Sequence, residues 1–167
     1  IGTSDTEVLL QGYVEYGSDV VNYIRGMFAF VIWDNQKNEV FVARDRFGEK
    51  PFYYFLEDNC FSFASNLSGI VALKHNQLTL SKQALYELLS QQYIDTTSCI
   101  YEGIYKLPPA CSMKITSESC EIKPYWNPDY TQKNEADFET HKTKLHHLLQ
   151  DAVSEQLVAD VPVGLFL

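Results

Sequence analysis

The sequence predicts a mixed α+β fold, in which helices and short strands follow one another along the chain. An unbroken apolar run at residues 27–33, a polar turn and a second apolar stretch at residues 40–43 form the pattern of a β-hairpin. Helix-start signals stand at Ser4 and Ser81, each ahead of apolar residues at helical spacing. A long amphipathic helix is expected after the polar segment 131–135.

A helix is expected near the N-terminal end of the chain. Ser4 and Glu7 fit a capping box, and Gly17 marks the expected end of this helix. A short second helix is suggested by the spacing of Val21, Ile24 and Met27. Residues 27–33 are rich in β-branched and aromatic types, so this strand is predicted to be buried on both faces.

A charged loop at residues 44–51 separates the hairpin from residues 52–56, which are expected to resume the same sheet. Within this loop Arg44, Asp45, Arg46 and Lys50 form a cluster of mixed sign. A salt-bridged loop that holds the hairpin in place is the favoured interpretation. An anion site is the alternative, and Asp45 and Glu49 would oppose it.

The later elements are shorter, apart from one helix. Strands are expected at residues 60–65, 111–115 and 121–125, and an extended segment is expected at 101–107. A short helix or turn is expected at 67–73, and a helix at 81–91. The helix that Ser81 opens is expected to bury Ala84, Leu85, Leu88 and Leu89. The long helix is expected to bury Phe138, Leu145, Leu148, Leu149, Ala152, Val153 and Leu157. Residues 161–167 have the pattern of a buried strand of a parallel sheet, after which phosphates often bind in α/β folds.

Composition excludes several classes of function. The net charge of −9 argues against a nucleic-acid surface, which normally needs a basic patch. No apolar run approaches the length of a membrane-spanning helix, and no signal peptide opens the chain. The four cysteines, Cys60, Cys99, Cys111 and Cys120, lack ligand spacing, so reduced thiols in a cytoplasmic protein are expected.

Few side chains suggest chemistry on their own. Asp5 stands in the first turn of its helix, where a carboxylate ordinarily complements the helix dipole; the functional alternative is an acceptor for the ammonium group of a ligand. His141, His146 and His147 share the long helix, but no two of them are four residues apart, so a metal pair is not expected. Both ends of the chain look cut, which predicts an internal piece of a longer protein.

Seven stretches, in order, resemble the glutamine-hydrolysing asparagine synthetases. They are SDTEVLLQGY at 4–13, GMFAFVIWD at 26–34, VFVARDRFGEKPFYY at 40–54, FASN at 63–66, IYEGIYKLPP at 100–109, YW at 125–126 and DVPVGLFL at 160–167. The resemblance implies that residues 1–130 are the C-terminal part of a glutaminase domain with the αββα amino-terminal-nucleophile hydrolase sandwich. It implies that residues 131–167 begin an α/β adenine-nucleotide-binding domain.

The resemblance also implies a reaction and its partners. A member hydrolyses glutamine and passes the ammonia to aspartate, which is activated with ATP and Mg²⁺, giving asparagine, glutamate, AMP and pyrophosphate. The partners are therefore small molecules, with no nucleic acid and no membrane, and homodimer formation is left open. This chain alone is expected to be inactive, because the catalytic cysteine, the arginine for the substrate carboxylate and the oxyanion donors would lie upstream of Ile1.

Only two site residues carry over from the family to this chain. Asp5 matches the aspartate that holds the α-amino group of glutamine, and Leu167 matches the leucine that contacts ATP beside the pyrophosphate loop. No catalytic residue and no metal ligand carries over. Asn66 departs from the pattern, since members commonly have an acidic residue after Ala-Ser.

Two rival functions remain. The first is a related amidotransferase with another acceptor, of the surface-polysaccharide or β-lactam synthetase type, which the sequence after Leu167 would distinguish. The second is a non-catalytic relative that keeps the glutaminase fold as a binding or assembly module. Its signature would be the absence of a cysteine immediately after the initiator methionine.

Overall fold

The computed structural model describes residues 4–57, 60–74, 78–131, 133, 135–159 and 161–164. The chain divides into two compact units, Ile1–Asn127 and Pro128–Leu167. Among the described residues, all the strands belong to the first unit, and the second contains one long helix.

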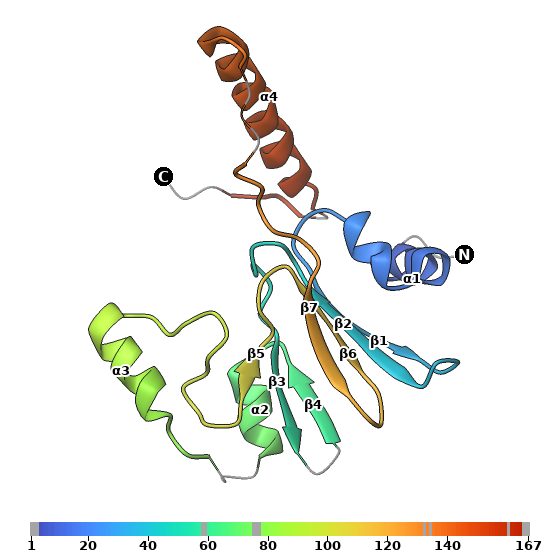
Figure 1. The fold of residues 1–167 in the computed structure, drawn as a ribbon, viewed down its shortest axis with the longest axis vertical. Helices are drawn as coiled ribbons and strands as arrows, with labels where there is room; N and C mark the ends of the chain where they lie inside the picture. The colour runs from blue at the N-terminus through green and yellow to red at the C-terminus, as the bar shows by residue number, and fades with distance from the viewer. Residues whose placement is uncertain are drawn as a thin grey trace. The chain divides into compact units, whose positions relative to one another are not determined.

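Four antiparallel strands form the larger sheet, in the spatial order β1-β2-β6-β7 (Figure 1). The strands are β1 Ala29–Asp34, β2 Glu39–Arg44, β6 Cys111–Ile115 and β7 Cys120–Pro124. β1 and β2 form the predicted hairpin, with Ala29 opposite Arg44 and Asp34 opposite Glu39. Asn38 ends the turn with a φ of 50°, in the left-handed region that asparagine tolerates.

β1 is less buried than predicted. Within the described residues it pairs only with β2 and so lies at the edge of the sheet. Ile32 is its one fully buried residue, and Trp33 is 58% exposed. The prediction of burial on both faces is therefore wrong for β1, while it describes β2, whose last four residues are all buried. An apolar run does not by itself distinguish an edge strand from a central one.

A second antiparallel sheet has the order β4-β3-β5. Its strands are β3 Tyr53–Glu57, β4 Cys60–Ala64 and β5 Tyr105–Lys106. The expectation that residues 52–56 resume the first sheet is wrong, because β3 pairs only with strands of the second sheet. The expected extended segment at 101–107 is reduced to β5 and an isolated bridge between Leu80 and Tyr101.

One face of the larger sheet is covered by the N-terminal helices, α1 Asp5–Tyr16 and the 3₁₀ helix η1 Gly17–Asn22. Ser4 caps α1, since its Oγ accepts a hydrogen bond from the Glu7 amide at 3.3 Å, and Gly17 ends the helix as predicted. The suggested second helix is η1, which ends before Ile24. Tyr13, Val20 and Val21 pack here in one cluster with Ile32, Phe41 and Ala43.

The opposite face of the larger sheet packs against the second sheet. Val42 of β2 and Met113 of β6 share a core cluster with Tyr54 of β3. The other side of β3 contacts α2 Leu67–Leu73, through Phe55 and Ile70. The first unit thus has the order helix, sheet, sheet, helix, and the predicted mixed α+β class with antiparallel sheets is confirmed.

Helix α3 Lys82–Gln91 begins after Ser81, which caps it as predicted, with Oγ accepting from the Ala84 amide at 3.2 Å. Its expected apolar face is not buried. Ala84 alone is buried, while the three leucines of that face, Leu85, Leu88 and Leu89, are exposed. Helical spacing identified the face correctly as apolar, but burial also needs a surface that packs against it.

The second unit contains α4 Phe138–Gln156, which is capped by Asp137. None of its residues is buried, so the expectation of a buried side is wrong for the described structure. Residues 161–164 form no strand, and the remainder of the expected strand lies outside the described residues. No helix in the described part of the chain is long and apolar enough to cross a membrane.

Candidate functional site

A cavity of about 620 Å³ lies in the first unit, beside the start of α1. Its walls come from α1, from the segment between η1 and β1, from the start of β1, from the charged loop and from Ser65, which follows β4. The lining residues include Asp5, Arg25, Phe28, Lys50 and Ser65. The cavity therefore combines one carboxylate and two cationic side chains with apolar walls, a composition typical of small-molecule sites.

Asp5 is an exposed residue in the first turn of α1 and lines this cavity. Its Oδ1 accepts a hydrogen bond from the Thr6 amide at 2.7 Å. A carboxylate at this place complements the helix dipole, as the simpler interpretation requires. Asp5 also lines a cavity, as the ammonium interpretation requires, and the two roles are compatible.

The charged loop after β2 is organised by Asp45, which is completely buried. Its carboxylate accepts hydrogen bonds from three backbone amides of the loop, those of Phe47 at 3.1 Å, Glu49 at 2.9 Å and Lys50 at 3.0 Å. Buried carboxylates persist when such donors satisfy them. Asp45 thus sets the path of the loop backbone up to Lys50, which lines the cavity.

Arg44 holds the same loop by donating hydrogen bonds to backbone carbonyl groups. Its guanidinium donates to the carbonyl oxygens of Lys50 at 2.8 Å, Leu107 at 2.6 Å and Gly48 at 2.6 Å. Burial lowers the pKa of the guanidinium, and the neighbouring Asp45 opposes this shift. The salt-bridged interpretation is therefore corrected: Arg44 and Asp45 do hold the loop, but through hydrogen bonds to its backbone.

Gly48 allows the loop backbone to approach the guanidinium of Arg44 closely. Its φ is 66°, and a Cβ built there would lie 2.9 Å from Pro109 and 3.0 Å from the guanidinium of Arg44. A side chain would therefore be strained by the backbone and would displace Arg44. Arg44, a candidate for the anion site that the sequence left open, instead uses Nε, Nη1 and Nη2 to bind three backbone carbonyl oxygens.

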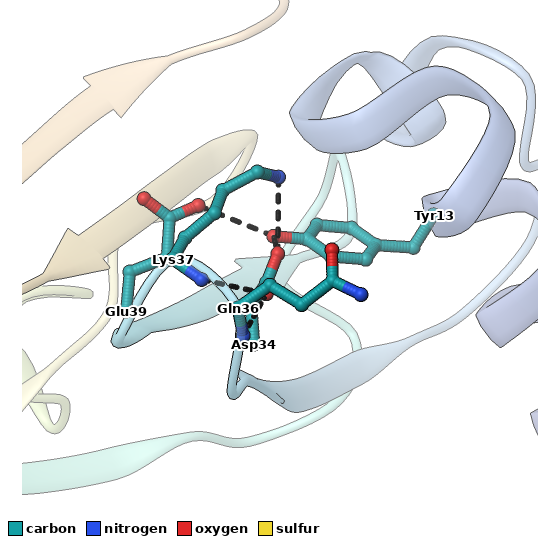
Figure 2. Close-up of polar contacts among 5 residues, drawn as sticks. All are labelled: Tyr13, Asp34, Gln36, Lys37 and Glu39. Atoms are coloured by element: carbon teal, nitrogen blue, oxygen red, sulfur yellow. Dashed lines mark hydrogen bonds and ion pairs between the residues drawn. The ribbon is translucent and has the colours of Figure 1, made fainter.

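A second polar cluster joins α1 to the hairpin turn (Figure 2). The Tyr13 hydroxyl lies 3.2 Å from Glu39 Oε1 and 3.4 Å from Asp34 Oδ2, and Lys37 Nζ forms an ion pair with Asp34 at 3.0 Å. Burial, with the two carboxylates adding and Lys37 opposing, raises the pKa of Tyr13 to about 12. A phenol that holds its proton so firmly is a poor nucleophile at neutral pH, so the cluster is a structural clasp.

The other candidates give no further site among the described residues. The three histidines lie exposed on α4. Cys99 and Cys111 are buried and Cys60 and Cys120 are exposed, and all four are free thiols. No group of three potential metal ligands occurs in the described part of the chain. Leu167, the predicted ATP contact, lies outside it.

Sequence reasoning missed two features of this region. The sequence predicts a structural role for Lys50 in the charged loop, and the structure places this residue in the cavity lining. No signal in the sequence separates Lys50 from the other charged residues of the loop. Asn66 had no assigned role, and it proves to be the N-cap of α2, with Oδ1 accepting from the Gly69 amide at 2.8 Å. An acidic residue could cap in the same way.

Comparison with known proteins places the chain among amidotransferases. A family model described as a glutamine amidotransferase domain matches residues 1–126. Asparagine synthetase [glutamine-hydrolyzing] 3 of Bacillus subtilis is 38% identical over 166 residues, covering 99% of this chain and 27% of that protein. Putative asparagine synthetase [glutamine-hydrolyzing] 2 of Methanocaldococcus jannaschii is 37% identical, covering 98% and 32%. "Amidase chry2" of Gibberella zeae is 30% identical, covering 100% and 25%.

The chain spans about a quarter to a third of the length of these relatives. The match to the family model ends at residue 126, beside the boundary between the two compact units at Asn127. It includes α1, both sheets and every residue named above as lining the cavity. The chain belongs to the glutamine amidotransferase domain family, and its relatives include glutamine-hydrolysing asparagine synthetases.

Proposed function

We propose that the first unit is the C-terminal part of a glutaminase domain, in which Asp5 holds the α-ammonium group of glutamine. The observation that carries this proposal is the position of Asp5, which lines a cavity in the matched region. An ammonium group held by a carboxylate makes charge-assisted hydrogen bonds, which are stronger than neutral ones. Fixing the α-carbon in this way orients the side-chain amide for attack.

The architecture of the first unit supports an αββα amino-terminal-nucleophile sandwich. Its helix, sheet, sheet, helix order is the order that this class requires. The catalytic cysteine of the class is its N-terminal residue, which the resemblance puts upstream of Ile1. The role of the described residues is accordingly to bind and orient glutamine, and the 167-residue chain alone is expected to show no glutaminase turnover.

For the complete protein we propose the synthesis of asparagine from aspartate, with ammonia from glutamine and with consumption of ATP. The names of the two asparagine synthetases among the relatives support this acceptor. The second unit would then begin the ATP-binding domain, with Leu167 beside the nucleotide. The described residues offer no cluster of ligands for Mg²⁺.

An amidotransferase with another acceptor is the second candidate. Its support is the relative from Gibberella zeae, which carries the name of an amidase and matches the whole chain at 30% identity. A shared glutaminase unit that feeds ammonia to different acceptors would account for both kinds of relative. The acceptor would be chosen by residues beyond the glutaminase unit. A non-catalytic relative and a homodimer remain expectations from the sequence.

Product analysis of the complete protein distinguishes these functions. With glutamine, aspartate, ATP and Mg²⁺, the leading proposal predicts glutamate, asparagine, AMP and pyrophosphate in equal amounts. Formation of glutamate without asparagine would favour another acceptor. Absence of glutamate under all conditions would overturn the glutaminase proposal and favour the binding or assembly module.

A further inference from the structure

The cavity beside α1 is lined by a lysine that no described residue neutralises through a hydrogen bond or an ion pair. Lys50 lines the cavity, its side chain is exposed, and its Nζ makes no hydrogen bond or ion pair with any described residue. Other described lysines do find carboxylates, among them Lys37 with Asp34 and Lys74 with Glu57. The charge of Lys50 is therefore available to a ligand in the cavity.

The backbone of Lys50 is held in place from both sides. Its amide donates to Asp45 Oδ2 at 3.0 Å, and its carbonyl accepts from Arg44 Nε at 2.8 Å. Pro51 follows and restricts Lys50 to extended conformations. Two buried charged residues thus fix the point from which the Lys50 side chain starts, and this reduces the conformational freedom that a ligand must remove.

The other cation on the wall is Arg25, which already has an interaction of its own within the chain. Asp5 contributes a carboxylate to the same cavity. An α-amino acid carries an ammonium group and a carboxylate on one carbon atom. A cavity that offers Asp5 and an uncommitted lysine is therefore complementary in charge to the whole α-carbon end of such a molecule.

We propose that Lys50 binds the α-carboxylate of the glutamine whose ammonium group Asp5 holds. This inference rests on the proposed glutaminase function and adds a specificity-determining residue to it. A carboxylate has two oxygens with several acceptor positions, so a lysine can bind it beside an arginine supplied from elsewhere. Lys50 thereby favours amino acids with a free carboxylate over analogues whose carboxylate is masked.

The test compares two substrates in the complete protein, glutamine and glutamine α-amide, which lacks the carboxylate charge. Lys50→Met should lower kcat/KM for glutamine about tenfold, the size of one charge-assisted contact, and leave kcat/KM for the α-amide unchanged within about twofold. Lys50→Arg should recover most of the activity with glutamine. Lys82→Met, the same charge change on α3, is the matched control and should alter neither substrate.

An equal loss with both substrates would overturn the role of Lys50, because it would show damage to the cavity wall without recognition of the carboxylate. No loss with either substrate would overturn it as well. Both results leave the glutaminase proposal standing, since the unmodified protein still hydrolyses glutamine. Failure of the unmodified protein to hydrolyse either substrate would overturn the proposed function and this inference together.

Discussion

At the scale of single residues, two buried charges shape the cavity. Asp45 accepts three backbone amides, and Arg44 donates to three carbonyl oxygens of the segments that meet there. A buried ion whose partners are all backbone groups has no mobile counter-charge, so its removal leaves several groups unsatisfied at once. The loop that carries Lys50 depends on both residues.

Replacement of Asp45 by alanine tests this dependence. Three amide donors of the loop lose their acceptor, and we expect the free energy of unfolding to fall by about 3 kcal/mol. Glu49→Ala, an exposed change in the same loop, should cost less than about 0.5 kcal/mol. Urea denaturation measures both values. Equal, small losses in the two variants would show that Asp45 does not organise the loop.

Tyr13 provides a pH-dependent test of the clasp. Because its folded pKa is raised to about 12 from an ordinary 10.0, the neutral phenol is favoured in the folded protein. Its contribution to stability is therefore complete below pH 10 and is lost as the pH rises through about 12. Tyr13→Phe should remove this part of the pH dependence of unfolding.

Ultraviolet absorbance of the phenolate follows the same group directly. Tyr125, whose hydroxyl donates to the Arg44 carbonyl at 2.7 Å, also has its pKa raised to about 12 by burial. The parent protein and Tyr13→Phe should therefore differ by the absorbance change of one tyrosine, and this difference should appear near pH 12, where Tyr13 and Tyr125 titrate. A phenol lost near pH 10 would mean that Tyr13 is not buried in the clasp.

The residues also show where sequence reasoning stops. The position of Asp5 in the first turn left two interpretations, complementing the helix dipole or accepting from a ligand's ammonium group, and the resemblance to the family favoured the second. Lys50 could not be separated from Arg44, because both stand in one charged loop and only the folded chain shows which charge is buried. Burial and partners depend on segments far away in sequence, such as Leu107.

At the scale of elements, local signals predicted helix ends well. Ser4, Gly17 and Ser81 act at the ends where the sequence placed them, because capping depends on a few consecutive residues. The hairpin of β1 and β2 followed from its apolar runs and its turn. The sheet to which β3 belongs could not be predicted, since strand pairing joins distant segments and the loop at 44–51 redirects the chain.

Burial of the amphipathic helices was overestimated for the same reason. α3 and α4 have apolar residues at helical spacing, but the described chain places no packing surface over Leu89 or Phe138. Periodicity reports which side of a helix is apolar and does not report its neighbour. The apolar sides are real, and the contacts that would bury them are absent from the described residues.

Asn66 gives a prediction for a single helix end. Asn66→Ala removes the acceptor for the Gly69 amide and should lower the free energy of unfolding by about 1 kcal/mol. Asn66→Asp keeps an acceptor at the N-terminus of α2 and should change it by less than about 0.5 kcal/mol. Thermal unfolding followed by circular dichroism separates the two. An equal loss in both variants would contradict the capping role.

At the scale of the whole molecule, the first unit combines a family match, a layered fold and one cavity of suitable charge. The second unit contributes a helix without a buried side. The two-region organisation predicted at 131–135 and the nucleotide role of the second region stay predictions. Fold class was predictable because it needs only the kinds of elements. The acceptor substrate was not, since we propose that it is chosen by residues beyond the first unit.

The glutaminase kinetics of Asp5→Asn in the complete protein test the central claim most directly. Asparagine keeps an acceptor for the Thr6 amide but removes the charge that binds the substrate ammonium. Glu7→Gln, in the same first turn but outside the cavity lining, makes the matched change to the helix dipole. We predict that Asp5→Asn lowers kcat/KM for glutamine about 10- to 100-fold while Glu7→Gln leaves it within about twofold. Equal kinetics in the two variants would contradict the account, because Asp5 would then only complement the dipole of α1 and would not bind the substrate.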